Sequence, residues 1–108
     1  MTQGTVHLTE ATFDAEVSAH KGILMIDFWA EWCQPCRALA PTLDELVRES
    51  SGAVSLAKVN VDEQPALAAR YGVRSIPTVV LIKDGKERDR IIGNVSKVQL
   101  KKKLDAVA

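Results

Sequence analysis

The chain has 108 residues, of which 46% are hydrophobic and 26% are charged. This balance is typical of a globular domain, and we expect residues 1–108 to form a single unit. The 14 Lys and Arg residues equal the 14 Asp and Glu residues in number, so no net basic charge favours binding to nucleic acid or to a membrane. Residues 1–5 lack the basic start and apolar core of a signal peptide, and the apolar run at residues 23–30 is too short to span a bilayer. We therefore expect a cytoplasmic protein.

The first two thirds of the chain alternate between helical and strand patterns. In chain order, these patterns predict a helix over about residues 10–19, a buried strand over residues 23–30, a helix over about residues 34–49, a strand over residues 53–61 and a short helix between Pro65 and Gly72. Thr9 is suited to cap the first helix, and Pro41 is expected to kink the second. The first strand is apolar on both faces, which is typical of a central strand that is covered on both sides. A further strand before the first helix stays open.

The C-terminal third has a different pattern. Two strands over residues 78–83 and 87–92 flank an Asp-Gly turn and predict an antiparallel hairpin. Ser96 and Gln99 have the spacing of a capping box at the start of a last helix. Strands that alternate with helices and end in a hairpin predict an α/β fold, in which a central mixed β-sheet is flanked by helices on both faces.

The only two cysteines, Cys33 and Cys36, follow the predicted central strand at the start of a predicted helix. Unpaired N–H groups and the helix dipole favour a thiolate there, and a second thiol one turn away can resolve a mixed disulfide. A purely structural disulfide would close a very short loop and contribute only about 2 kcal/mol. A structural zinc site would need four ligands, which His7 and His20 do not complete at ligand spacing. Both alternatives stay open, but the pattern favours a redox pair, with Cys33 as the more exposed nucleophile and Cys36 as the shielded resolving thiol.

The order of strand, C-x-x-C segment and helix resembles the thioredoxin family of the bacterial type, from about Thr5 to the C-terminus. The matching segments are residues 27–33, 35–36, 40–41, 58–62, 71–73, 76–78, 83–85 and Gly93. Gln34 differs from the family pattern, which usually has Gly between the cysteines, and Ser75 and Asn94 also differ from the commonest residues. The resemblance implies the thioredoxin fold and a thiol–disulfide oxidoreductase that reduces protein disulfides through a reversible Cys33–Cys36 pair.

Two charged residues lie within otherwise apolar strand patterns. Asp27 is expected to have a raised pKa, because burial disfavours the ionised carboxylate. Lys58 lies between two apolar residues, and the two side chains share a site if their strands are neighbours. The resemblance implies that Asp27 is the general acid/base for Cys36 and that Lys58 modulates it. The alternative is a solvated Asp27 at a strand end, with Lys58 reaching out to solvent.

The resemblance also implies a substrate-docking patch around the sulfurs. Its expected members are Trp32, Gln34, Pro35, Ile76, Pro77, Ile92 and Gly93. Cis bonds make up only about 5–6% of X–Pro bonds, so the sequence alone favours a trans Pro77, whereas the resemblance implies a cis bond that leaves the Ile76 backbone free to pair with an extended substrate. For each patch residue taken singly, the sequence favours a place in the core or in a turn.

The resemblance further implies which partners the chain has. We expect no bound cofactor and no metal, with electrons supplied from NADPH by a flavoprotein thioredoxin reductase. The expected substrates are disulfide-containing proteins such as reductases and peroxidases, and the chain is expected to be a monomer. The rival hypotheses are an isomerase or oxidase on the same fold and a binding module, either zinc-holding or a scaffold that uses the docking patch without turnover.

Overall fold

The computed structural model describes residues 5–108. Residues 1–4 lie outside this range, and with them most of the segment from which the absence of a signal peptide was predicted. The elements in chain order are β1 (Val6–His7), α1 (Phe13–Ala19), β2 (Ile23–Trp29), α2 (Gln34–Glu49), β3 (Val54–Asn60), α3 (Pro65–Arg70), β4 (Thr78–Lys83), β5 (Lys86–Ile92) and α4 (Lys97–Val107). Between residues 5 and 108, no helix combines the length and the apolar character needed to cross a membrane.

The strands of the described chain form one mixed sheet in the order β1-β3-β2-β4-β5. The central strand β2 pairs in parallel with β3 and antiparallel with β4. The short strand β1 runs parallel to β3 at one edge, and β5 completes the predicted hairpin with β4 at the other. This arrangement confirms the predicted mixed sheet, and it brings the ends of β2 and β3 that precede α2 and α3 to the same edge.

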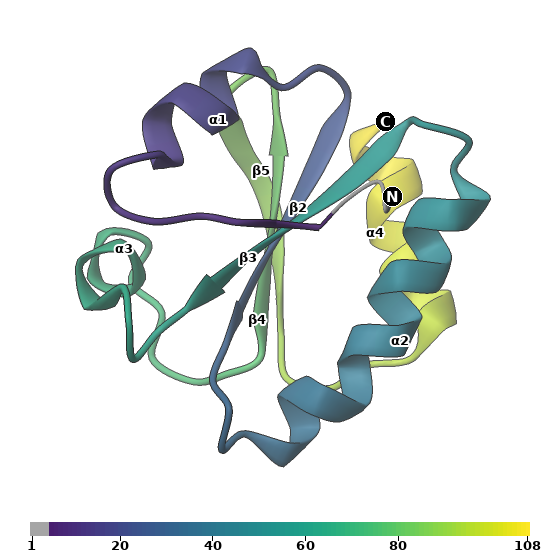
Figure 1. The fold of residues 1–108 in the computed structure, drawn as a ribbon. Coiled ribbons are helices and arrows are strands. Elements are labelled where there is room, and N and C mark those ends of the chain that lie inside the picture. Colours follow the sequence, from purple (N-terminus) through teal and green to yellow (C-terminus); the bar gives the residue numbers. More distant parts are fainter. Residues whose placement is uncertain (1–4) are drawn as a thin grey trace.

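Helices cover both faces of the sheet, as Figure 1 shows with the sheet seen nearly edge-on. Helices α2 and α4 lie on one face and α1 and α3 on the other. The core on the first face is built from buried side chains of β2, β4, α2 and α4, including Met25, Leu43, Leu81 and Leu100. The core on the second face contains Phe13, Ile26, Phe28, Val59 and Val80. Since alternate residues of β2 enter the two cores, this strand is apolar on both sides.

The boundaries of two helices follow their sequence signals closely. Helix α2 spans the predicted residues 34–49 and continues through Pro41, which lies inside it without ending it. The predicted capping box of α4 is present: Gln99 N–H donates to Ser96 Oγ at 3.1 Å, and Ser96 N–H donates to Gln99 Oε1 at 3.1 Å. In both helices, a side chain at the helix start accepts a hydrogen bond from a backbone N–H that has no partner within the helix.

The predicted start of α1 is wrong, because the helix begins at Phe13 and not near Glu10. Thr9 nevertheless makes the bonds expected of a cap: Thr9 N–H donates to Thr12 Oγ1 at 3.0 Å and Thr12 N–H donates to Thr9 Oγ1 at 3.2 Å. Phe13 N–H also donates to the Thr9 carbonyl at 2.9 Å, so Thr9 closes a turn that leads directly into α1. Thr12, the residue immediately before the helix, forms no side-chain cap bond.

Candidate active site

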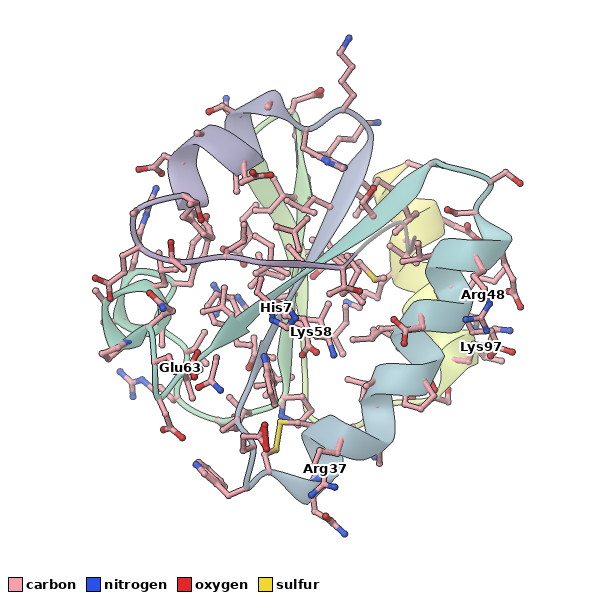
Figure 2. All side chains as sticks on the ribbon, in the orientation of Figure 1. His7, Arg37, Arg48, Lys58, Glu63 and Lys97 are labelled. Atoms are coloured by element: carbon pink, nitrogen blue, oxygen red, sulfur yellow. A yellow bond between two sulfur atoms is a disulfide. The ribbon has the colours of Figure 1, made fainter. Side chains whose placement is uncertain are left out.

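Cys33 and Cys36 form a disulfide at the start of α2, with their Cα atoms 5.3 Å apart. Figure 2 shows this bond at the N-terminal end of the helix, close to the labelled Arg37. Cys33 is the N-cap residue, and its Sγ accepts a hydrogen bond from Cys36 N–H at 3.2 Å. Pro35 lies in the first turn, where a residue without an N–H is tolerated because no carbonyl precedes it to accept a bond. The Cys33 sulfur thus lies where helix N–H groups stabilise a thiolate.

The two cysteines are almost equally buried, which corrects the expectation that Cys33 is clearly the more exposed one. Cys33 is 3% and Cys36 is 2% exposed. The reason is that Ala30, Trp29 and Ile76 pack around the disulfide and cover both residues. The two sulfurs therefore differ mainly in their position on the helix: Cys33 lies at its cap and Cys36 within its first turn.

Asp27 lies in the middle of the sheet on the side that faces α2, and it is only 1% exposed. Its register partner on β3 is Lys58, so the two charged residues are neighbours across parallel strands, as the sequence suggested. Burial raises the pKa of Asp27 to about 6, while the nearby Lys58 charge lowers the pKa and the Asp44 charge on α2 raises it. A solvated Asp27 at a strand end is therefore excluded.

Lys58 is half-buried and does not form an ion pair with Asp27 in the described part of the chain. Its ammonium lies over the ring of Trp29, 5.6 Å from the ring centroid. This is within the range of a cation–π contact. The structure thus places the Trp29 ring next to the charged pair.

The docking patch predicted around the disulfide comes from three separate segments. Trp32 (69% exposed) and Ile92 (60% exposed) present apolar surface, and Gln34 and Pro35 are exposed at the start of α2. The Ile76–Pro77 peptide bond is cis, as the resemblance implied.

The backbone at the cis bond is partly paired. Gly93 N–H donates to the Pro77 carbonyl at 2.8 Å, which ties the end of β5 to this loop. Gly93 has a φ of 90°, a conformation that other residues rarely adopt. Within residues 5–108, neither main-chain group of Ile76 forms a backbone hydrogen bond, so an extended peptide can pair with it.

Two features of this site were missed from the sequence. Asp62, just after β3, accepts a hydrogen bond from the Trp32 indole N–H at 2.8 Å and so fixes the exposed ring. An open apolar hollow of about 330 Å³ also lies beside the ring, lined by Trp32, Val61, Ala68, Val73, Arg74, Ser75 and Ile76. The signal that could have found Asp62 is topological, because residues that follow two parallel neighbouring strands meet at the same edge of a sheet.

Metal-binding side chains do not gather at this site. Among residues 5–108, no three His, Cys, Asp or Glu side chains come together in a way that could hold a metal ion.

A mixed sheet flanked by helices, with a disulfide at a helix start beside a cis-proline, defines a class of thiol–disulfide oxidoreductases. The sequence model of the thioredoxin family matches residues 4–106, and this chain belongs to that family. It is 46% identical over 98 residues to "Thioredoxin 1" of Synechococcus elongatus, an alignment that covers 91% of this chain and 92% of the relative. It is 42% identical over 106 residues to "Thioredoxin" of Pseudomonas aeruginosa, with 98% of each chain covered.

A third relative, "Thioredoxin 2" of Chlorobaculum tepidum, is 44% identical over 97 residues, with 90% of this chain and 89% of the relative covered. Family membership, near-complete coverage and the Cys33–Cys36 disulfide together make this chain a protein-disulfide oxidoreductase. Members of the family generally work with a thioredoxin reductase and with disulfide-containing substrates.

Proposed function

We propose that this chain is a thioredoxin of the bacterial type, a single-domain cytoplasmic monomer that reduces protein disulfides by means of its Cys-Gln-Pro-Cys segment. The observation that carries the proposal is the position of the Cys33–Cys36 disulfide at a helix start, beside an unpaired main-chain segment at Ile76. The first feature supplies a reactive sulfur, and the second supplies a place for an extended substrate.

The first chemical step is an attack on the substrate by the reduced protein. The Cys33 thiolate, stabilised by the helix N–H groups, attacks one sulfur of the substrate disulfide and forms a mixed disulfide with it. The other substrate sulfur leaves as a thiolate and takes a proton from solvent. This role fits Cys33 because its sulfur already accepts the Cys36 N–H bond at the N-cap.

The second step releases the reduced substrate. Cys36 gives its thiol proton to the Asp27 carboxylate, and the Cys36 thiolate then attacks the Cys33 sulfur. The bond between Cys33 and the substrate breaks, the substrate leaves as a thiolate that is protonated by solvent, and the protein disulfide is restored. A pKa of about 6 suits Asp27 to this role, because the carboxylate is ionised at neutral pH and still basic enough to accept a proton. Lys58 modulates Asp27 through its charge.

Substrate docking in this proposal relies on backbone pairing and on apolar contact. An extended segment pairs with the Ile76 main chain, next to the cis Pro77, and lies against the exposed faces of Trp32 and Ile92. The hollow beside Trp32 receives a substrate side chain. Gly93, Gln34 and Pro35 complete the surface around the sulfurs.

The electrons are proposed to come from NADPH through a flavoprotein thioredoxin reductase, so that the chain itself needs no bound cofactor or metal. Its proposed substrates are oxidised proteins such as reductases and peroxidases. The support for this assignment is membership of a family whose members generally use such a reductase, together with relatives that bear the name thioredoxin.

Disulfide reduction of insulin by dithiothreitol tests the proposal, with the wild type compared with Cys33→Ser and Cys36→Ser. We expect turnover to be lost in both variants, and only Cys36→Ser to accumulate a mixed disulfide with the substrate. A mixed disulfide trapped in Cys33→Ser instead would reverse the two roles. No turnover by the wild type, with unchanged partner binding in a double variant, would favour a scaffold. An equilibrium potential at the oxidising end of the scale against glutathione would favour an oxidase or isomerase.

A further inference from the structure

We propose that Trp29 is a positioning residue, whose ring holds the Lys58 ammonium beside Asp27 and so keeps that carboxylate ionised and ready to accept the Cys36 proton. This inference rests on the proposed role of Asp27 in the second step. It assigns to Trp29 a function beyond the packing of its side chain around the disulfide, because the ring acts on the proton transfer through Lys58.

The three side chains project from the same face of the sheet. Asp27 and Trp29 are two residues apart on β2, so both point toward the face that is covered by α2. Lys58 is the register partner of Asp27 on β3, and its Nζ lies 5.6 Å from the centroid of the Trp29 ring. The ammonium therefore contacts the ring next to the carboxylate and forms no direct ion pair with it in the described chain.

The Lys58 ammonium needs a contact that keeps it near Asp27, because the position of Lys58 lets its side chain reach solvent. A lysine ammonium lies on a flexible four-carbon stem and is strongly hydrated, so it moves to solvent unless a contact retains it. Solvent is near. Within residues 5–108, the two-residue strand β1 is the only strand on the outer side of β3, and its residue His7, the register partner of Lys58, is exposed. Figure 2 shows His7 and Lys58 next to each other.

Trp29 interacts with the Lys58 cation through the face of its ring and not through its indole N–H. Its Nε1 is buried and has no hydrogen-bond partner in the described chain. A phenylalanine ring can therefore replace the indole in part, because it retains a negative face for the cation. An aliphatic side chain cannot.

The pKa of Asp27 depends on where the Lys58 charge lies, because burial and Asp44 both raise this pKa. Asp44, which faces it from α2, raises the pKa of Asp27, as burial does more strongly. Lys58, from β3, is the nearby charge that lowers this pKa. His7 lies one strand further out, on the far side of Lys58. If the Lys58 ammonium moves to solvent, burial and Asp44 are left without opposition, and the carboxylate is protonated at higher pH.

The test is a pH titration of the Asp27 carboxyl carbon by NMR in the oxidised protein. We expect Trp29→Leu to raise the titration midpoint by about half a pH unit, the effect of withdrawing one partly screened charge, and Trp29→Phe to raise it much less. Lys58→Met should also raise the midpoint. In the Lys58→Met background, Trp29→Leu should cause no further change, because the cation through which Trp29 acts is absent.

An equal shift from Trp29→Leu with and without Lys58 would overturn the proposal, because the ring would then act by excluding water. No shift at all, or a shift as large in Trp29→Phe as in Trp29→Leu, would also overturn it. If Trp29→Leu does not fold, fluorinated tryptophan incorporated in a Trp32→Phe background weakens the ring's negative face without changing its shape. We then expect the midpoint to rise with each added fluorine when Lys58 is present and to stay constant in Lys58→Met.

The titration needs no turnover, so it separates this inference from the proposed mechanism. In Trp29→Leu, we expect the acidic limb of the pH–rate profile for insulin reduction to move upward by the same amount as the Asp27 midpoint. A shifted midpoint with an unshifted rate profile would leave the positioning of Lys58 intact and would contradict the role of Asp27 as the proton acceptor for Cys36.

Discussion

At the scale of single residues, burial of the Asp27 carboxyl raises its affinity for a proton and makes its ionised form destabilising to the folded protein. Its pKa is about 6 in the folded protein, compared with 3.8 for an unperturbed aspartate. The folded state therefore holds the proton more tightly than the unfolded chain does, and stability falls as the pH rises from about 4 to about 6. Above that window the ionised carboxylate costs the full amount, on the order of 3 kcal/mol.

Asp27→Asn should for this reason stabilise the oxidised protein at neutral pH. We expect a gain of up to about 3 kcal/mol at about pH 7.5 and almost none at about pH 3.5, where the native carboxyl is already neutral. Urea unfolding at the two pH values measures the difference. Glu31→Gln is the matched control, because Glu31 is exposed and its neutralisation should change stability by less than about 0.5 kcal/mol at either pH. A gain that is the same at both pH values would show that ionisation is not its cause.

A second residue-scale prediction concerns Gln34, which lies between the cysteines and is exposed at the start of α2. Replacing Gln34 by Gly changes the helix propensity by at most about 1 kcal/mol, which corresponds to a change in the redox potential of at most about 20 mV. We therefore expect Gln34→Gly to leave the chain a reductant. Equilibration of the wild type and the variant with glutathione buffers measures both potentials. A change several times larger would mean that the Gln34 side chain contacts one of the sulfurs directly in one redox state.

At the scale of elements, the sequence was informative where the signal is local. The bounds of α2 were predicted from its helical pattern of apolar residues, and the capping box of α4 was predicted because Ser96 and Gln99 act on their own helix. The start of α1 was predicted about one turn too early, because Thr9 caps a turn whose residues precede the regular helix.

The capping box gives the prediction that belongs to this scale. Ser96→Ala removes the oxygen that accepts Gln99 N–H and should lower the free energy of unfolding by about 1 kcal/mol. Ser18→Ala, at an exposed position inside α1, is the control, and it should be neutral or slightly stabilising because Ala has the higher helix propensity. Urea unfolding of both variants decides the matter, and equal effects would mean that the Ser96 hydroxyl is not needed as a cap.

At the scale of the whole molecule, the site joins segments whose proximity depends on strand order. The sequence indicated that Asp27 and Lys58 are charges within apolar strand patterns, but their proximity depends on β2 and β3 being parallel neighbours. The bond between Trp32 and Asp62 and the contact between Lys58 and Trp29 depend on the same pairing and were not predicted. Local pattern therefore identified the cysteine pair and the two charged strand residues, whereas their contacts with other segments required the sheet register.

The shared sheet also predicts how the molecule unfolds. The two cores lie on opposite faces of β2, β3 and β4, so losing either core exposes apolar side chains of strands that the other core needs. We therefore expect one cooperative transition in urea. Trp29 and Trp32 report on the active-site end by fluorescence, and far-UV circular dichroism reports on all helices and strands, so the two midpoints should coincide. In Trp32→Phe, fluorescence then reports on Trp29 alone, and its midpoint should still coincide with that of circular dichroism. A fluorescence transition that precedes the loss of secondary structure would mean that the disulfide end unfolds as a separate unit.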